Sequence, residues 1–259
     1  MTALLIATRN AHKAREIQRI LAADYQCLTL QDFPGAPATV EDGATFAANA
    51  AKKVSALADW LAAKPQSWVA GRALLARRPR HPHPAPSTST PSTPSTIPPP
   101  RQAGREVPSP RLFYLMADDS GLEVDALGGA PGVHSARFAA LDGAGADNSP
   151  DRANNAKLLR LLEGVPAARR TARFRCVLAV RRWFPPSAAG NVLFEGVCAG
   201  RIGLQPAGGG GFGYDPLFIP EGCSQSFAEL GDAVKNSRSH RALALQKLRD
   251  YLANHRGNP

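Results

Sequence analysis

The chain has 259 residues, of which 44% are hydrophobic, and this is enough for one large domain or two small ones. No stretch approaches the roughly 20 consecutive apolar residues that span a bilayer, and the apolar run at 3–7 is too short for a secretory signal. The four cysteines lie far apart without a Cys-x-x-Cys spacing, which argues against a zinc site or a redox dithiol. We therefore expect a cytoplasmic protein with no membrane contact.

The net charge of +10 would suit a nucleic-acid-binding protein, but this charge is unevenly distributed. Between Pro65 and Leu112 there are seven arginines and one glutamate, so the rest of the chain carries only +4. The same segment is rich in proline, serine and threonine, a composition that cannot build a packed core. We predict one domain over 1–259, interrupted by a disordered insertion at about 65–111, and we expect no specific nucleic acid partner.

Outside that segment, the apolar residues alternate between the periods of strands and helices. In chain order they predict a strand at 4–7, a helix at 13–22, a helix from 45 to about 61, a strand at 112–117, a helix at 151–162, strands at 173–180 and 191–197, and a final helix at 240–252 behind an N-cap at Ser239. Such alternation is typical of the α/β class.

Two adjacent carboxylates, Asp118 and Asp119, follow the apolar run at 112–117, where we expect a buried strand to surface into a loop. Neighbouring side chains on a strand point to opposite faces, so one carboxylate should face a site and the other a structural partner. A hard cation such as Mg²⁺ is the expected ligand, since it binds one or two carboxylates together with phosphate and water. An ordinary Asp-Asp-Ser-Gly turn is the alternative.

A second polar group, Thr8, Asn10 and Lys13, lies between the first strand and the first helix. Free N–H groups at a helix start, two hydrogen-bonding side chains and an ammonium group form an anion cradle. An ordinary strand-to-helix connection with solvated charges is the alternative.

The glycines at 208–213 satisfy the dinucleotide pattern G-x-G-x-x-G, but no helix is expected after them, so that interpretation fails. A glycine-rich loop ending in exposed aromatics can instead let a flat base stack on Phe212 or Tyr214. Further on, Lys235, Arg238 and Arg241 are predicted at the start of the last helix, where they oppose the helix dipole. An anionic or keto-bearing ligand would explain these cations, and a solvated basic turn is the alternative.

Taken in order, these motifs resemble the inosine/xanthosine triphosphate pyrophosphatase family. The resemblance covers the whole chain except the proline-rich segment, and it rests on Thr8-x-Asn10-x-x-Lys13, Glu41-Asp42-Gly43-x-Thr45-Phe46, Asn49-Ala50-x-x-Lys53, Asp118-Asp119-Ser120-Gly121-Leu122, Gly128-Gly129-Ala130-Pro131-Gly132, Ser135-Ala136-Arg137-Phe138, Gly210-Gly211-Phe212-Gly213-Tyr214-Asp215-Pro216 and Lys235-Asn236-x-x-Ser239-His240-Arg241.

The resemblance implies a long, curved mixed sheet flanked by helices, in two lobes with a central nucleotide cleft, usually as a homodimer. It implies Mg²⁺-dependent hydrolysis of ITP, dITP and XTP to the monophosphate and pyrophosphate, which clears deaminated purines from the nucleotide pool. By motif match, Asp119 is the catalytic residue, and Asp119 and Glu41 hold the metal. The substrate-binding residues implied are Thr8, Asn10, Lys13, Lys53, Ser120, Phe212, Gly213, Tyr214, Asp215, Lys235, His240 and Arg241.

Base choice follows from hydrogen bonding. Hypoxanthine and xanthine present a 6-oxo acceptor where adenine presents an amino donor, so donors of His240 or Arg241 would oppose another donor in ATP. One departure is Ala48, where family members often carry Glu, which removes a carboxylate from the metal side. Two rival functions stay open, a phosphatase of modified pyrimidine nucleotides and nucleic acid binding through the basic insertion.

Overall fold

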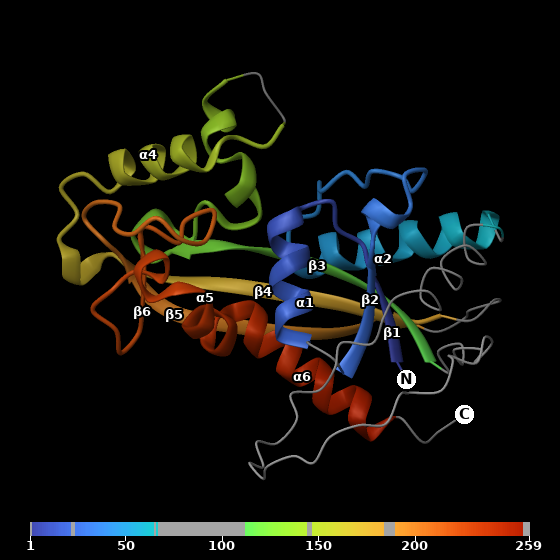
Figure 1. Ribbon diagram of the computed structural model, residues 1–259. Coiled ribbons are helices and arrows are strands. Elements are labelled where there is room, and N and C mark those ends of the chain that lie inside the picture. Colours follow the sequence, from blue (N-terminus) through green and yellow to red (C-terminus); the bar gives the residue numbers. More distant parts are fainter. Residues whose placement is uncertain are drawn as a thin grey trace, which may run out of the picture.

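The computed structural model describes residues 2–21, 24–64, 66, 112–143, 147–183 and 190–255. The described strands form a six-stranded mixed sheet in the order β2-β1-β3-β4-β5-β6 (Figure 1). They are β1 (Thr2–Ile6), β2 (Tyr25–Thr29), β3 (Leu112–Val124), β4 (Thr171–Arg182), β5 (Val192–Ile202) and β6 (Phe218–Pro220). β1 is parallel to β2 and β3, and the pairings from β3 to β6 are antiparallel. The predicted mixed α/β class is confirmed.

The described helices flank this sheet, and several begin at a side-chain cap. They are α1 (Ala11–Leu21), α2 (Phe46–Ala63), α4 (Asp151–Leu161), α5 (Phe227–Arg238) and α6 (His240–Asn254), with short 3₁₀ turns at Leu30–Asp32, Asp125–Leu127, Gly132–Arg137, Ala139–Asp142 and Ala167–Arg169. Thr45 accepts a hydrogen bond from the N–H of Ala48 at the start of α2, and Ser239 accepts from Ala242 at the start of α6. The predicted N-cap at Ser239 is confirmed.

The sequence did not predict α5, and this changes the place of the basic residues before Ser239. Lys235 and Arg238 lie in the last turn of α5, where cations are favourable to the helix dipole, and only Arg241 opens α6. The expectation that all three cations oppose one dipole was wrong. The argument for a ligand at this place must therefore come from the geometry of the site.

β3 also differs from its prediction. It does not surface into a loop after Ala117 but continues through both carboxylates to Val124, paired with β4 over its length. β1 pairs with β3 only as far as Met116, and the chain then leaves the sheet toward α1. Among the described residues, no strand lies beside β3 on this side between Met116 and Glu123, where Pro131 forms an isolated bridge, and this opening positions the site.

The sheet has a helical layer on each face in one lobe, and a separate core in the other (Figure 1). Leu57 and Leu61 of α2 pack on one face with Leu115, while helices α1 and α6 pack on the opposite face around Met116 and Leu245. The second lobe has a core that includes the rings of Phe138, Phe174, Phe218 and Phe227. The long strands β3, β4 and β5 run through both lobes.

Gly196 on β5 brings the strand backbone against the start of α6. A Cβ built there would lie 2.0 Å from the carbonyl oxygen of His240 and 2.5 Å from the backbone nitrogen of Ala244, both far inside van der Waals contact. Only glycine allows this approach.

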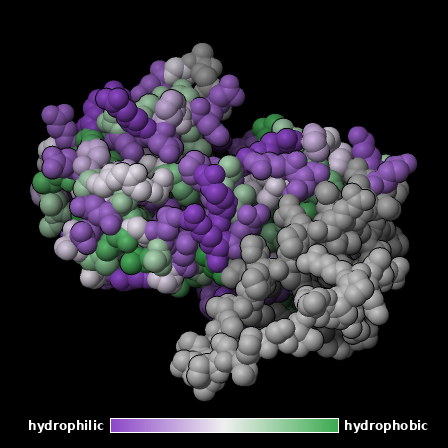
Figure 2. All heavy atoms as spheres, viewed as in Figure 1, coloured by the Kyte–Doolittle hydropathy of each residue, from purple (hydrophilic) through white to green (hydrophobic). Residues whose placement is uncertain are grey.

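The surface in this view carries hydrophilic side chains over α1 and is notched at its upper edge between the two lobes (Figure 2). Within the described part of the chain, no helix has the length and apolar character needed to cross a membrane. The insertion predicted at about 65–111 lies outside the described residues except for residue 66, and that division of the chain stays a prediction.

Candidate active site

A cavity of about 810 Å³ lies between the lobes, beside the uncovered part of β3. The backbone N–H of Ala7 still bonds to the carbonyl of Met116, at 2.7 Å, but the next residues turn away into α1. Every site residue predicted from the sequence lines this cavity, namely Thr8, Asn10, Lys13, Glu41, Lys53, Asp119, Ser120, Phe212, Gly213, Tyr214, Asp215, Lys235, His240 and Arg241. Residues more than 200 positions apart in the sequence are thus brought together.

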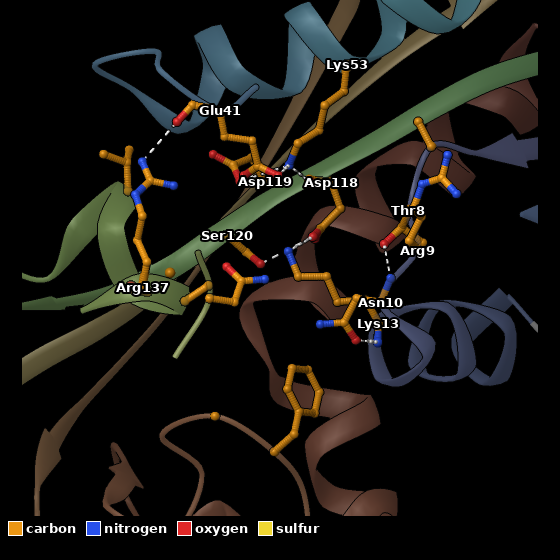
Figure 3. A pocket seen from close by; sticks show the side chains of 18 of the residues that line it. Thr8, Arg9, Asn10, Lys13, Glu41, Lys53, Asp118, Asp119, Ser120 and Arg137 are labelled. Carbon is orange, nitrogen blue, oxygen red and sulfur yellow. Dashed lines mark hydrogen bonds and ion pairs between the residues drawn. The ribbon is translucent and has the colours of Figure 1, made fainter. Parts of the chain in front are cut away.

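The two adjacent carboxylates do point to opposite faces, as predicted. Asp118 lies on the face covered by α1 and α6, and its oxygens bond to Lys13 and Arg241. Asp119 lies on the face covered by α2 and bonds to Lys53. Figure 3 shows both side chains leaving the same strand toward these different partners. Because none of the described strands lies beside β3 at this point, both carboxylates still reach the cavity.

Asp118 is the centre of a buried ionic network. Its Oδ1 is 2.5 Å from Lys13 Nζ and its Oδ2 is 3.1 Å from Arg241 Nε, while Arg241 Nη1 is 2.8 Å from Glu16 Oε2. Burial alone would raise the pKa of Asp118, but the charges of Arg241 and Lys13 hold it well below its ordinary value. Arg241 Nη2 also donates to Ser120 Oγ at 2.8 Å, so the network fixes the next side chain on the same face of β3.

Asp119 has a different environment. Burial and the carboxyl of Glu41 raise its pKa to about 6, although Lys53 opposes the shift. Lys53 Nζ is 3.2 Å from Asp119 Oδ1 and 2.9 Å from Glu41 Oε1, so one ammonium serves two carboxylates (Figure 3). Asn49, which is only 1% exposed, donates from Nδ2 to Asp119 Oδ2 at 3.1 Å. Asp119 is therefore held in a fixed orientation and takes up a proton near neutral pH.

The polar group predicted at the start of α1 is organised around Asn10, and the N–H groups of His12 and Lys13 are not free, as the sequence predicted, but bonded to it. Its Oδ1 accepts from the backbone N–H groups of His12 and Lys13, at 2.9 and 3.1 Å, and its own N–H donates to Thr8 Oγ1 at 3.2 Å. These bonds cap α1 and leave the amide donors of Asn10 for a ligand. The cradle carries the Lys13 ammonium at the point where α1 meets the cavity.

The ring of Phe212 lines the same cavity and lies next to the start of α1. Lys235 Nζ is 4.2 Å from its centroid and also 2.5 Å from Asp215 Oδ2, while His12 stacks on Phe212 at a centroid distance of 5.3 Å. Burial and the carboxylate of Glu16 raise the pKa of Asp215, against the effect of Lys235. A flat aromatic surface and a cation lie side by side here.

His240 also lines the cavity, as a neutral imidazole. Burial and the nearby charges of Arg241 and Lys235 hold its pKa well below the ordinary value. Its ring stacks on Phe174 at a centroid distance of 4.7 Å. Among the described residues, its buried Nδ1 has no hydrogen-bond partner. A buried polar atom without a partner is costly, so this nitrogen favours a ligand group that can reach it and form a hydrogen bond.

The glycine-rich loop is fixed by α4 instead of being free. Gly213 donates its N–H to Asp151 Oδ2 at 2.6 Å and accepts from Asn155 Nδ2 at 3.0 Å, and these two partners lie one helical turn apart. Tyr214 is not an exposed aromatic, as the sequence suggested, but is buried and donates from its hydroxyl to the carbonyl of Ser135 at 2.9 Å. Phe212 is half-buried, and it is the aromatic residue that the loop presents to the cavity.

Sequence reasoning missed several residues that organise the site. Asn49 lies in one of the motifs, but the sequence assigned it no role. Glu16 on α1 lies in none of the motifs and was also assigned no role. A signal existed for Glu16, because a carboxylate on a face with Ile17 and Leu21 faces the core and requires a buried cation. Ala48 is exposed and does not line the cavity.

Comparison with known proteins agrees with this geometry. The dITP/XTP pyrophosphatase of Desulforamulus reducens is 40% identical to this chain over 250 residues, covering 96% of this chain and 94% of that protein. The dITP/XTP pyrophosphatase of Geobacillus kaustophilus is 40% identical over 249 residues, covering 96% and 93%. The solved structure of the Staphylococcus aureus Ham1 protein has a TM-score of 0.66 at 28% identity, covering 98% of this chain and 99% of that one. The sequence model of the Ham1 family matches residues 4–71 and 101–251, and the chain therefore belongs to the Ham1 family.

Proposed function

We propose that this chain hydrolyses the triphosphates of deaminated purine nucleosides, ITP, dITP and XTP, to the monophosphate and pyrophosphate, with Mg²⁺ as the cofactor. The observation that carries the proposal is Asp119, a carboxyl held by Lys53 and Asn49 that lines one cavity together with Asn10, Lys13 and the ring of Phe212. The names of the relatives, dITP/XTP pyrophosphatases, support the same reaction.

The donor atoms at Asp119 fit Mg²⁺. The carboxyls of Asp119 and Glu41 are in contact, and two adjacent carboxylates with one lysine between them favour a further cation. The described residues contain no group of three or more His, Cys, Asp or Glu arranged around a metal position. Oxygen ligands from two carboxylates, completed by phosphate and water, are what Mg²⁺ prefers. When bound by Asp119 and Glu41, Mg²⁺ would neutralise phosphate charge at the reacting phosphorus.

The roles of the protein's own groups follow from their positions. Asp119 orients the attacking water and accepts its proton. Asn49 keeps the carboxylate turned toward the substrate. Lys13 and the amide donors of Asn10 bind the phosphates at the start of α1, and Lys53 supplies positive charge from α2. None of these groups has to form a covalent bond.

The base end supports the preference for 6-oxo purines. Phe212 offers a stacking surface, and His240 offers a nitrogen that lacks a partner within the described structure. In the tautomer that carries its proton on the nitrogen facing the base, neutral His240 donates to a 6-oxo group and opposes the donor of a 6-amino group. The preference for 6-oxo purines therefore requires that tautomer, because the other one would accept a hydrogen bond from a 6-amino group. A site built to hydrogen-bond its ligand can reject a mismatched competitor by about 10⁴-fold.

The deciding experiment measures pyrophosphate and orthophosphate release from ITP, dITP, XTP, ATP and GTP, with Mg²⁺ and with EDTA. We expect pyrophosphate from the first three, only with the metal. Release of orthophosphate would instead favour the alternative, a phosphatase of modified nucleotides. Equal rates with ATP would contradict the proposed base preference.

Two further properties implied by the family stay predictions. A homodimer is expected, and light scattering of the purified protein would test it by molar mass. A cytoplasmic location is expected as well, and cell fractionation would test it.

A further inference from the structure

The described lining of the cavity has no excess of positive charge to attract a polyanionic ligand. It contains six lysines and arginines against seven aspartates and glutamates. Four of the six cations are already paired with carboxylates. These ion pairs are Lys13 with Asp118, Lys53 with Glu41 and Asp119, Lys235 with Asp215, and Arg241 with Asp118 and Glu16.

The other two cations, Arg9 and Arg137, have no carboxylate within ion-pair distance among the described residues. Arg9 Nη2 donates to the backbone carbonyl of Ala36 at 2.5 Å, and Arg137 Nη2 donates to the backbone carbonyl of Glu41 at 2.9 Å. A carbonyl oxygen accepts a hydrogen bond without cancelling the charge. A guanidinium has five N–H donors, so these bonds leave donors for a ligand. Arg9 belongs to the cradle at 8–13, whereas Arg137 comes from the opposite lobe.

Arg137 is also held firmly in place. The Asn154 side chain donates to the carbonyl of Ala136 at 3.2 Å and accepts from the N–H of Ala139 at 2.8 Å, which fixes the backbone on both sides of Arg137. The adjacent Phe138 is buried in the core of the second lobe. A backbone pinned on both sides loses little entropy on binding, so Arg137 is suited to preorganised recognition.

We propose that Arg137 is a phosphate-binding residue that grips the part of the triphosphate beyond the reacting phosphorus, the part that leaves as pyrophosphate. The inference rests on the proposed function. Arg137 contacts the backbone of Glu41, a residue beside Asp119, and Figure 3 shows it reaching this place from the side opposite Lys13. The phosphate chain is then held from both lobes, by the cradle on one side and a bidentate guanidinium on the other.

A structural role is the competing explanation, because the bond to Glu41 could merely position a metal ligand. The two roles differ in what they predict without metal. A phosphate-binding arginine contributes to the affinity for inorganic tripolyphosphate in EDTA. If Arg137 only positions Glu41, its substitution should raise the Mg²⁺ concentration needed for activity and leave the affinity for tripolyphosphate unchanged.

The test is calorimetric titration of the full chain with inorganic tripolyphosphate in EDTA, comparing wild type, Arg137→Gln and Arg160→Gln. Arg160 is a matched control, because it lies in the same lobe, is exposed, pairs with Asp142 and does not line the cavity. We expect Arg137→Gln to weaken binding about tenfold or more and to flatten its salt dependence, since one charged contact is lost. The control should bind like wild type.

Affinity of Arg137→Gln within about twofold of wild type would overturn the proposal, and so would a wild type that does not bind tripolyphosphate. If circular dichroism shows that the variant does not fold, the test uses wild type alone. Bound tripolyphosphate should then protect Arg137 from modification by phenylglyoxal, as measured by peptide mapping. Absence of this protection would overturn the proposal. The titration measures binding and needs no turnover. Failure to hydrolyse ITP would contradict the proposed function, and the activity assay detects it independently of this titration.

Discussion

Asp118 and Asp119 are neighbours on β3 and have pKa values shifted in opposite directions. The carboxylate of Asp118 lies against Arg241 and Lys13, which keep it ionised, whereas burial and Glu41 raise the pKa of Asp119 to about 6. The alternation of a strand sends two identical side chains to two different sets of partners. One becomes a structural counter-ion and the other a group that can exchange a proton.

Asp118→Asn should therefore destabilise the fold. The change leaves the buried cations of Arg241 and Lys13 without their shared counter-ion, and breaking a buried pair in this way costs about 3–5 kcal/mol. Urea unfolding at pH 7 measures the loss, with the exposed Asp142→Asn as the control. A free energy of unfolding equal to that of wild type would show that the network does not stabilise the protein.

Asp119→Asn should have the reverse profile. Hydrolysis of ITP should fall by on the order of 10²-fold or more, because the group that accepts the proton is lost. The fold should not suffer, because burial already disfavours the charged form of Asp119 and Lys53 keeps Glu41 as a partner. The free energy of unfolding at pH 7 should be equal to or larger than that of wild type. Turnover like that of wild type would remove Asp119 from the mechanism.

The pH dependence follows from the same group. In the folded chain Asp119 has a pKa of about 6, against 3.8 for the ordinary side chain. We expect kcat/KM for ITP to rise with pH at values below about 6 in wild type, because bound Mg²⁺ favours the ionised carboxylate and lowers its pKa from the value without metal. The folded state holds the proton more tightly, so Asp119 contributes a decrease in stability as pH rises from 3.8 to about 6. Unfolding curves of wild type and Asp119→Asn across this range should converge at the acidic end, and parallel curves would contradict the shift.

Base selectivity should depend on His240. His240→Ala removes the ring that faces the base end and should lower the ITP to ATP ratio of kcat/KM, with little change in binding of tripolyphosphate. Arg241→Ala is a poorer test, because Arg241 is 1% exposed and bonds to Asp118 and Glu16. It should reduce stability together with selectivity. An unchanged ratio in His240→Ala would exclude the base-reading role.

Removal of the proline-rich segment should leave the enzyme intact. The family's sequence model matches 4–71 and 101–251 and passes over the residues between. The described helix α2 ends at Ala63, and β3 begins at Leu112. A chain that joins Lys64 to Leu112 through a short linker should keep its melting temperature and hydrolyse ITP at least as well. Loss of folding would show that our division of the chain is mistaken.

Most long elements were predictable because each satisfies its own local pattern. The helix at 240–252 was predicted from its N-cap and apolar face, and α6 spans His240–Asn254. β2 and β6 are only five and three residues long, too short to show a period. α5 was missed because Gly231, with a φ of 77°, interrupts it in the middle. The end of β3 was predicted too early, because the sequence Asp118-Asp119-Ser120-Gly121 is compatible both with a turn and with a strand that has one free edge.

The site was predictable as a set of motifs but not as a network. Motif matching found the residues that line the cavity, yet the pairing of Arg241 with Glu16 joins helices more than 200 residues apart, and nothing local encodes it. The same holds for Asp151 and Asn155, whose grip on Gly213 depends on how α4 lies against the loop. Such contacts come from tertiary packing alone.

Gly196 shows how far this dependence extends. It touches no ligand position, yet any side chain there would press on the carbonyl of His240 and push the start of α6 outward. In a genetic screen for lost activity, Gly196 variants should therefore score alongside substitutions of the residues that contact nucleotide. A map of positions that tolerate no substitution will therefore include the contact between β5 and α6 as well as the cavity. Gly196 will look like an active-site residue on that map although it lies behind α6.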